Sequence, residues 1–201
     1  MSGAGQVPFV GLTGGIGSGK STALAALDEL GAATLSADAV VHELLGSDEL
    51  RDAIAARLGQ DVLDAEGAID RSAVAARVFG QAEDRAWLEG LLWPRVGARI
   101  MEWRAEVEAR EVRPPAAVVE VPLLFESGMD SVFDTTIAVV VAESRRAERA
   151  GARGHTAVAE RVGRQLTQQE KADRAGLVVR NDGTREELKA ELSHVLATIR
   201  H

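Results

Sequence analysis

A glycine-rich stretch near the N-terminus carries the clearest chemistry in the chain. Its order is Gly14-Gly15-Ile16-Gly17-Ser18-Gly19-Lys20-Ser21, which fits the pattern G-x-x-x-x-G-K-[S/T] at each fixed position. Glycines let backbone amides converge on phosphate oxygens, and a helix beginning near Lys20 adds its positive end. We expect Lys20 to reach the β- and γ-phosphates, Ser21 to hold Mg²⁺ through its hydroxyl, and Thr22 to add a hydroxyl on the α-phosphate side. Residues Gly15–Thr22 are therefore predicted to bind a nucleoside triphosphate; the alternative is a glycine-rich turn followed by a solvated lysine.

The sequence around this motif predicts a strand before it and a helix after it. Phe9–Thr13 is a short apolar run, and Ser21–Leu30 places leucines at helical spacing. A second strand is expected over Ala33–Ser36 and a second helix over Ala39–Leu45. A βαβ opening of this kind predicts a parallel sheet covered by helices, the α/β class. By itself, the motif fits an ATPase, a GTPase or a kinase equally well.

Residues 48–110 differ in character from this opening. They are largely helical in pattern and hold all three tryptophans, so we expect an inserted helical subdomain. Pro94 is expected to break or start a helix there, because it lacks an amide donor and disfavours helix at Trp93. Apolar runs then predict strands over Ala116–Val121, Thr136–Ala142 and Leu177–Val179, and a closing helix begins at about Thr184. The expected core domain comprises residues 1–47, 111–142 and 175–201.

Composition narrows the classes of partner. At 201 residues and 46% hydrophobic content, the chain can bury one substantial core, or one core and a small appended domain. The formal charge of −8 argues against non-specific binding to nucleic acid, because such binding depends on Lys and Arg contacts to phosphates. Residues 143–174 carry eight basic against five acidic side chains, so an anionic ligand is expected to seek that segment. The chain has no cysteine, which excludes a disulfide framework and a thiolate metal site. No apolar run approaches the ~20 residues that span a bilayer, so we expect no membrane partner and a cytoplasmic protein.

Several further pieces of sequence, spread over most of the chain, resemble the dephospho-CoA kinase family. The most discriminating is Val121-Pro122-Leu123-Leu124-Phe125-Glu126, after a predicted buried strand. The resemblance implies a P-loop NTPase-type parallel sheet flanked by helices, an acceptor-binding role for the subdomain at 48–110 and a basic lid at 143–174. It also implies that ATP and dephospho-CoA are the substrates, and that the γ-phosphoryl group passes to the ribose 3′-hydroxyl to give CoA and ADP, the last step of CoA synthesis. The other pieces that carry it are Leu12–Thr22, Ala37-Asp38, Glu43-Leu44-Leu45, Asp70-Arg71, Val78-Phe79, Trp87-Leu88-Glu89, Leu91-Leu92, Gln165 and Asn181-Asp182-Gly183.

Three charged positions take catalytic roles by this resemblance. Asp38 matches the aspartate that accepts the proton of the attacking hydroxyl, and its place past the second predicted strand puts it at the carboxyl edge of the sheet. The alternative for Asp38 is a helix N-cap ahead of Ala39. Arg149 and Arg153 match the lid arginines that neutralise charge on the transferring phosphoryl group. They share a helical face with Arg145, and a solvated basic face explains any one of them equally well.

Two further segments are matched to the binding pockets. Asn181 corresponds to a position near the adenine, although a turn formed by Asn-Asp-Gly explains it equally well. Residues Pro122, Leu123, Leu124, Phe125 and Glu126 are expected to line the acceptor side. Plain core packing is the alternative for Leu123, Leu124 and Phe125. Trp87 and Trp103 fit a core role better than a ligand platform.

The chain departs from the family pattern at three places. The family usually has aspartate where Ser36 stands, His-Pro where Trp93-Pro94 stand, and Ala-Asp where Ala175-Gly176 stand. These departures concern the acceptor and adenine pockets and leave the glycine-rich motif and Asp38 intact.

Rival functions remain to be separated from this one. A nucleoside monophosphate kinase would use the same phosphate cradle, lid and base. A GTP-dependent switch would need an Asn-Lys-x-Asp signature, which Asn181-Asp182-Gly183 does not supply. An inactive relative would be expected to lack Lys20, Ser21 or Asp38. The sequence does not specify an oligomeric state.

Overall fold

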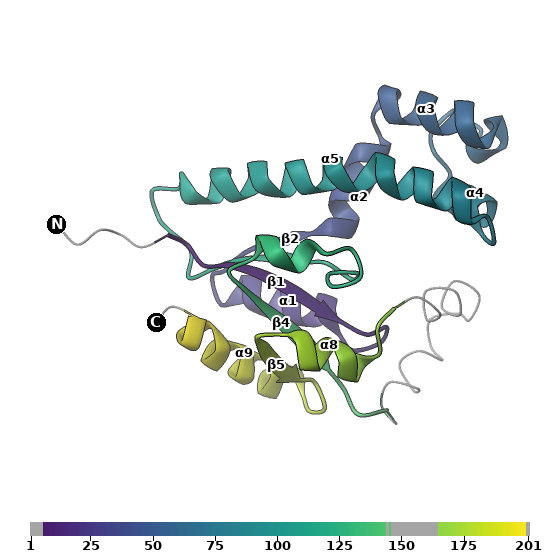
Figure 1. The fold of residues 1–201 in the computed structure, drawn as a ribbon. Helices are drawn as coiled ribbons and strands as arrows, with labels where there is room; N and C mark the ends of the chain where they lie inside the picture. The colour runs from purple at the N-terminus through teal and green to yellow at the C-terminus, as the bar shows by residue number, and fades with distance from the viewer. Residues whose placement is uncertain (1–5, 144, 146–164, 200–201) are drawn as a thin grey trace. The chain divides into compact units, whose positions relative to one another are not determined.

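The computed structural model describes residues 6–143, 145 and 165–199 (Figure 1). It divides into two compact units, Met1–Ser36 with Arg104–His201 (unit 1) and Ala37–Trp103 (unit 2). Arg149, Arg153 and most of the expected lid at 143–174 lie outside the described residues.

Unit 1 contains the parallel sheet that the sequence predicts. Its strands are β1 (Phe9–Gly14), β2 (Ala33–Ser36), β3 (Ala117–Glu120), β4 (Thr135–Val140) and β5 (Leu177–Arg180), in the order β2-β3-β1-β4-β5. All four pairings are parallel. Because β1 is central, the loop that follows it emerges between the ends of β3 and β4. The α/β prediction and each predicted strand are confirmed.

One face of this sheet is covered by α1 (Lys20–Glu29) and α9 (Arg185–Ile199), which lie side by side (Figure 1). Both helices were predicted from their apolar spacing, and in α9 the leucines recur every four residues, which places them on one face. Their apolar side chains meet those of four strands in one core. Its central members are Val10, Leu12, Ala23, Ala26, Leu27, Val118, Ile137, Val139, Val179, Leu188, Leu192 and Leu196.

The opposite face of the sheet holds the segment that follows β3. Phe9 packs there against Phe133 with ring centroids 4.6 Å apart, and the guanidinium of Arg104 lies 4.6 Å from the centroid of the Phe9 ring. A short 3₁₀ turn, η2 (Met129–Val132), joins this segment to β4. Leu124 is fully buried on this side.

Unit 2 is helical. It comprises α2 (Ala37–Leu45), α3 (Asp48–Leu58), η1 (Gln60–Val62), α4 (Arg71–Val78) and most of α5 (Ala82–Glu108). Ser47 caps α3 by accepting from the Leu50 amide, and Asp70 caps α4 by accepting from the Ser72 and Ala73 amides. A small core of Ile54, Leu58, Val62 and Val74 is closed by Trp87 and other partly buried side chains. Trp87 therefore takes the core role that the sequence favoured.

The expectation that Pro94 breaks or starts a helix is wrong. α5 runs through Pro94 without interruption over 27 residues. The proline removes one hydrogen bond, to the carbonyl of Gly90, and no heavy atom lies within 4 Å of where a Gly90 side chain would begin, so that turn is open. The helix persists because Val96, Ile100, Trp103 and Val107 are buried at helical spacing beyond the proline.

A short helix, α8 (Gln168–Arg174), precedes β5. Thr167 caps it in a reciprocal capping box with Glu170, and hydrogen bonds from the Thr167 hydroxyl and amide hold the pKa of Glu170 below its ordinary value.

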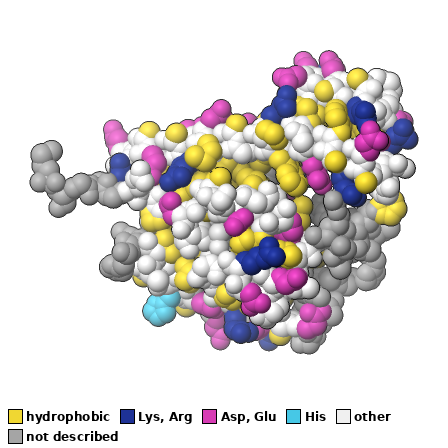
Figure 2. Space-filling view, in the orientation of Figure 1, with side chains coloured by type: hydrophobic (Ala, Val, Ile, Leu, Met, Phe, Trp, Pro, Cys, Tyr) yellow, Lys and Arg dark blue, Asp and Glu magenta, His cyan; other side chains and the backbone are white. Residues whose placement is uncertain are grey.

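Acidic and basic side chains are interspersed over the face shown in Figure 2. Among the described residues, no helix is long and apolar enough to cross a membrane.

Candidate active site

The predicted phosphate-binding residues form the loop between β1 and α1, as the motif requires. Gly19 adopts φ 90°, in the left-handed region that favours glycine, at the N-cap of α1. A Cβ on Gly14 would lie 2.5 Å from the Val139 carbonyl oxygen and 2.6 Å from Ser18 Oγ. Both glycines are therefore required by this backbone path. The loop owes its shape to the neighbouring strand β4 as well as to its own residues.

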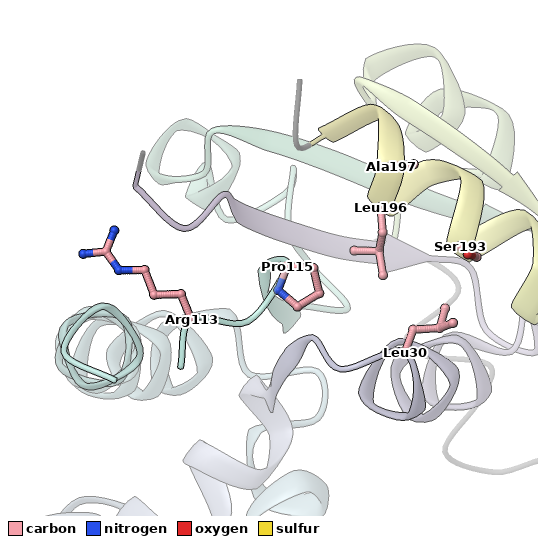
Figure 3. A pocket seen from close by; sticks show the side chains of 6 residues that line it. All are labelled: Leu30, Arg113, Pro115, Ser193, Leu196 and Ala197. Carbon is pink, nitrogen blue, oxygen red and sulfur yellow. The ribbon is translucent and has the colours of Figure 1, made fainter. Parts of the chain in front are cut away.

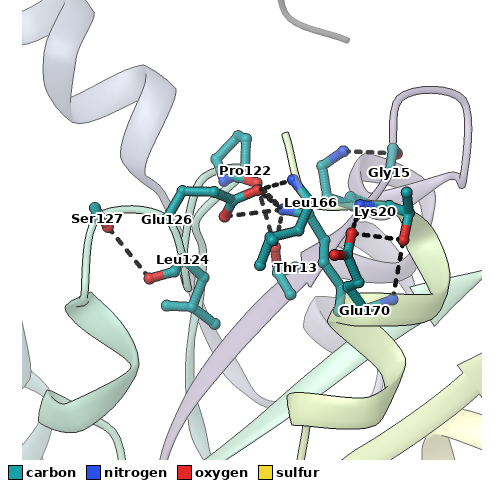
Figure 4. Close-up of polar contacts among 11 residues, drawn as sticks. Thr13, Gly15, Lys20, Pro122, Leu124, Glu126, Ser127, Leu166 and Glu170 are labelled. Carbon is teal, nitrogen blue, oxygen red and sulfur yellow. Dashed lines mark hydrogen bonds and ion pairs between the residues drawn. The ribbon is translucent and has the colours of Figure 1, made fainter. Parts of the chain in front are cut away.

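The polar groups of the loop suit phosphate. Lys20 Nζ donates to the Gly15 carbonyl at 3.1 Å, so the ammonium is held at the loop (Figure 4). Ser21 and Thr22 are exposed in the first turn of α1. Ser18 Oγ is buried and has no hydrogen-bond partner in the part of the chain that the structure describes. Backbone amides at a helix N-terminus beside a lysine and free hydroxyls form an anion site, and the residues present fit a triphosphate.

Asn181 supports this loop from the far end of the chain. It follows β5, is 5% exposed, and its side-chain Nδ2 donates to the Ser18 carbonyl at 2.8 Å. Its backbone amide donates to the Val140 carbonyl, also at 2.8 Å. The side chain thus ties the carboxyl edge of the sheet to the phosphate loop. A role near the adenine stays a prediction.

We predict that Asn181→Ala raises the KM for ATP about tenfold and lowers Tm by several degrees. The substitution leaves the Ser18 carbonyl without its donor, a loss of about 1–3 kcal/mol, and each kcal/mol shifts Tm by about 2–4 °C for a chain of this size. Steady-state kinetics and thermal unfolding measure the two effects. The matched control is Gln169→Ala, which removes a side-chain amide whose bond to Asp173 is exposed. Equal effects from both variants would contradict the supporting role of Asn181.

Part of the segment after β3, residues 122–126, is too buried to line an acceptor site. Leu124 is fully buried and Phe125 is 9% exposed, so core packing accounts for both. Pro122, Leu123 and Glu126 are partly buried, and their contact with an acceptor stays a prediction.

Sequence reasoning missed two residues of α8 that face this segment and the loop. Lys171 is fully buried and bonds to the segment after β3. The side-chain amide of Gln168 accepts from the backbone amide of Val141, just past β4, and donates to the carbonyl of the same residue. The Gln168 Cβ also lies next to the phosphate loop, 3.8 Å from where a Cβ on Gly15 would be. A lysine within a charged run reads as solvated, so the sequence contains no signal for its burial.

Asp38 is the exposed second residue of α2, which begins at Ala37 directly after β2. The helix starts two residues earlier than the sequence suggested, so the alternative of an N-cap at Asp38 is wrong. The carboxylate lies in the first turn, where it complements the helix dipole. Its role as the base stays a prediction.

A separate hollow of about 420 Å³ lies between the end of α1, residues 113–115 and α9 (Figure 3). Leu30 lines it just beyond the C-terminal end of α1, whereas the phosphate loop precedes the N-terminus of that helix. One helix length, roughly 15 Å, separates them, so this hollow is distinct from the phosphate site.

Comparison with known proteins decides among the families that share this loop. The model of the dephospho-CoA kinase family matches residues 8–187. This chain belongs to the dephospho-CoA kinase family. A dephospho-CoA kinase of Symbiobacterium thermophilum is 39% identical over 189 residues, which cover 92% of this chain and 78% of the relative. One from Geobacillus kaustophilus is 38% identical, with 93% and 94% covered. The family resemblance seen in the sequence is confirmed.

Solved structures agree with the fold of a dephospho-CoA kinase. The Thermus thermophilus protein TT1252 is 32% identical, with a TM-score of 0.80 over 96% of this chain and 98% of that one. Dephospho-CoA kinase from Campylobacter jejuni is 24% identical, with a TM-score of 0.64 over 97% and 98%. At 15% identity and a TM-score of 0.51, the shikimate kinase of Aquifex aeolicus shares the fold alone, over 94% of this chain and 96% of its own.

Proposed function

We propose that this protein transfers the γ-phosphoryl group of ATP to the ribose 3′-hydroxyl of dephospho-CoA, giving CoA and ADP. The observation that supports this most is an intact phosphate loop at the centre of a parallel sheet, in a chain that matches the dephospho-CoA kinase family over residues 8–187. In the transfer, the bond between the γ-phosphorus and the bridging oxygen breaks as the ribose oxygen bonds to phosphorus. The hydroxyl proton passes to a base, and ADP leaves.

The loop residues hold the donor in this proposal. Amides of residues 15–20 bind the β-phosphate region, Lys20 neutralises charge on the β- and γ-phosphates, and Thr22 contacts the α-phosphate side. Mg²⁺, when bound, would supply positive charge near the β- and γ-phosphates. Ser21 would hold it together with the nucleotide, and Glu120, a buried carboxylate at the end of β3, would be a further oxygen donor at this edge of the sheet.

The acceptor side rests on family position. Asp38 is assigned to orient and deprotonate the 3′-hydroxyl, and Arg149 and Arg153 to neutralise the transferring group. The partly buried Pro122, Leu123 and Glu126 are assigned to line the acceptor. The helical unit is assigned to bind the rest of the acceptor. A cytoplasmic location also stays a prediction.

A panel of acceptors tests the proposal. The protein is incubated with Mg-ATP and, separately, dephospho-CoA, AMP, CMP, UMP or shikimate, and both ADP release and the mass of the product are measured. Among these acceptors, we expect only dephospho-CoA to give rapid formation of a product that is heavier by one phosphoryl group. Turnover of a nucleoside monophosphate with none of dephospho-CoA would reject the proposal in favour of a nucleotide kinase.

A further inference from the structure

Lys171 is a fully buried lysine whose ammonium joins three segments of unit 1. Its Nζ donates to the Pro122 carbonyl at 2.6 Å and lies 2.9 Å from Glu126 Oε1 and 3.5 Å from Thr13 Oγ1. Thr13 is the residue before Gly14, where the phosphate loop starts, and its hydroxyl donates to the same Pro122 carbonyl at 3.3 Å. Figure 4 shows Thr13, Pro122 and Glu126 converging at this point.

Glu126 is committed to this network. Besides the ion pair, its Oε1 accepts from the backbone amide of Leu166 at 2.9 Å, and its side chain is 13% exposed. The carboxylate therefore satisfies partners within the protein, on the segment that leads into α8.

A second contact fixes α8 three residues earlier. Gln168 pairs with the amide and carbonyl of Val141 at 2.8 Å and 2.7 Å, so one face of the helix is anchored to the end of β4. Gln168 and Lys171 share that face because residues three apart are neighbours on a helix. Together they connect α8 to the ends of β1, β3 and β4, the edge of the sheet that carries the phosphate loop.

We propose that Lys171 is a positioning residue that sets the segment 122–126 in register with the phosphate loop. The carbonyl oxygen of Pro122 has two lone pairs and accepts hydrogen bonds from both Lys171 and Thr13. The start of the acceptor segment therefore cannot shift without losing both bonds. The kinetic consequence of this inference rests on the proposed function, because the segment contacts an acceptor only if the protein phosphorylates dephospho-CoA. Lys171 reaches the phosphate loop only through its 3.5 Å contact with the Thr13 hydroxyl, so nucleotide binding is expected to be less sensitive.

A double substitution separates positioning from simple stability. Lys171→Met leaves Glu126 buried without its counter-charge and is expected to lower Tm by roughly 10 °C. Lys171→Met combined with Glu126→Leu removes both charges and replaces them with apolar side chains of similar volume. The Tm of the double variant should therefore return most of the way to that of the unmodified protein. We expect the double variant to retain a KM for ATP within about threefold of the unmodified protein, while the KM for dephospho-CoA rises about tenfold or more.

Hydrogen exchange supplies a readout that needs no acceptor. In the double variant, amides of residues 123–128 should exchange at least about tenfold faster than in the unmodified protein, with α1 and α9 unchanged. Lys189→Met is the matched control: it removes a lysine from a pair with Glu29 in which both side chains are about 40% exposed, and it should change neither Tm nor kinetics measurably.

The outcomes are distinct. Normal exchange over residues 123–128 together with a normal KM for dephospho-CoA in the folded double variant would overturn the positioning role. If the double variant does not fold, Glu126→Gln, which keeps the shape and weakens the pair, must show the same faster exchange, and normal exchange there overturns the proposal. Failure of the unmodified protein to phosphorylate dephospho-CoA would reject the proposed function, while the exchange measurement still decides the role of Lys171.

Discussion

Lys20→Ala is expected to lower phosphoryl transfer by roughly 10²- to 10³-fold, the usual loss on removing one preorganised donor from a developing charge. Lys20 Nζ is held at the loop by the Gly15 carbonyl, close to where the phosphates of ATP are expected. Because this single, partly buried bond contributes only about 0.5–1.5 kcal/mol to folding, Tm should fall by a few degrees at most. Single-turnover kinetics and thermal unfolding measure the two quantities.

The control for Lys20 is Lys189→Ala, a lysine of α9 paired with Glu29 at the surface. It should leave turnover and ATP affinity unchanged. Turnover of Lys20→Ala close to that of the unmodified protein would show that the loop does not act on the γ-phosphoryl group.

Asp38→Asn is expected to cut turnover by about 10²- to 10⁴-fold at saturating substrate, as loss of a general base does. The amide keeps the size of the side chain and its place in the first turn of α2, so affinity for ATP should be retained. Loss of one carboxylate from a helix N-terminus costs only about 0.3–1 kcal/mol, so Tm should change by a few degrees at most.

Asp48→Asn is the matched control, since Asp48 occupies the first turn of α3 in the same unit. Both variants should lower Tm by a similar small amount, and only Asp38→Asn should lower turnover. Near-normal turnover of Asp38→Asn would mean that the base assignment is wrong.

The local parts of this fold were predictable from the sequence. Ala33–Ser36 and the central strand follow from short apolar runs, and the phosphate loop follows from a motif whose residues are contiguous. The start of α2 was placed two residues late because Ala37 and Asp38 carry no periodic signal of their own.

The errors and omissions concern features set by distant residues. Pro94 continues α5 because burial further along the helix outweighs one missing hydrogen bond. Lys171 is buried because its partners, Glu126 and Pro122, lie 45 and 49 residues away in the chain. No local pattern distinguishes it from the exposed basic residues around it. The roles of Asp38, Arg149 and Arg153 stay predictions from family position, and the Asp38→Asn variant tests the first of them.

The bond from Asn181 to the Ser18 carbonyl spans 163 residues. During synthesis, the motif at residues 14–21 leaves the ribosome early, yet its last support is made only after β5 has been synthesised and has joined the sheet. A nascent or truncated chain that ends before Asn181 therefore carries the complete motif without the complete site, and affinity for ATP should report the arrival of the C-terminal strand.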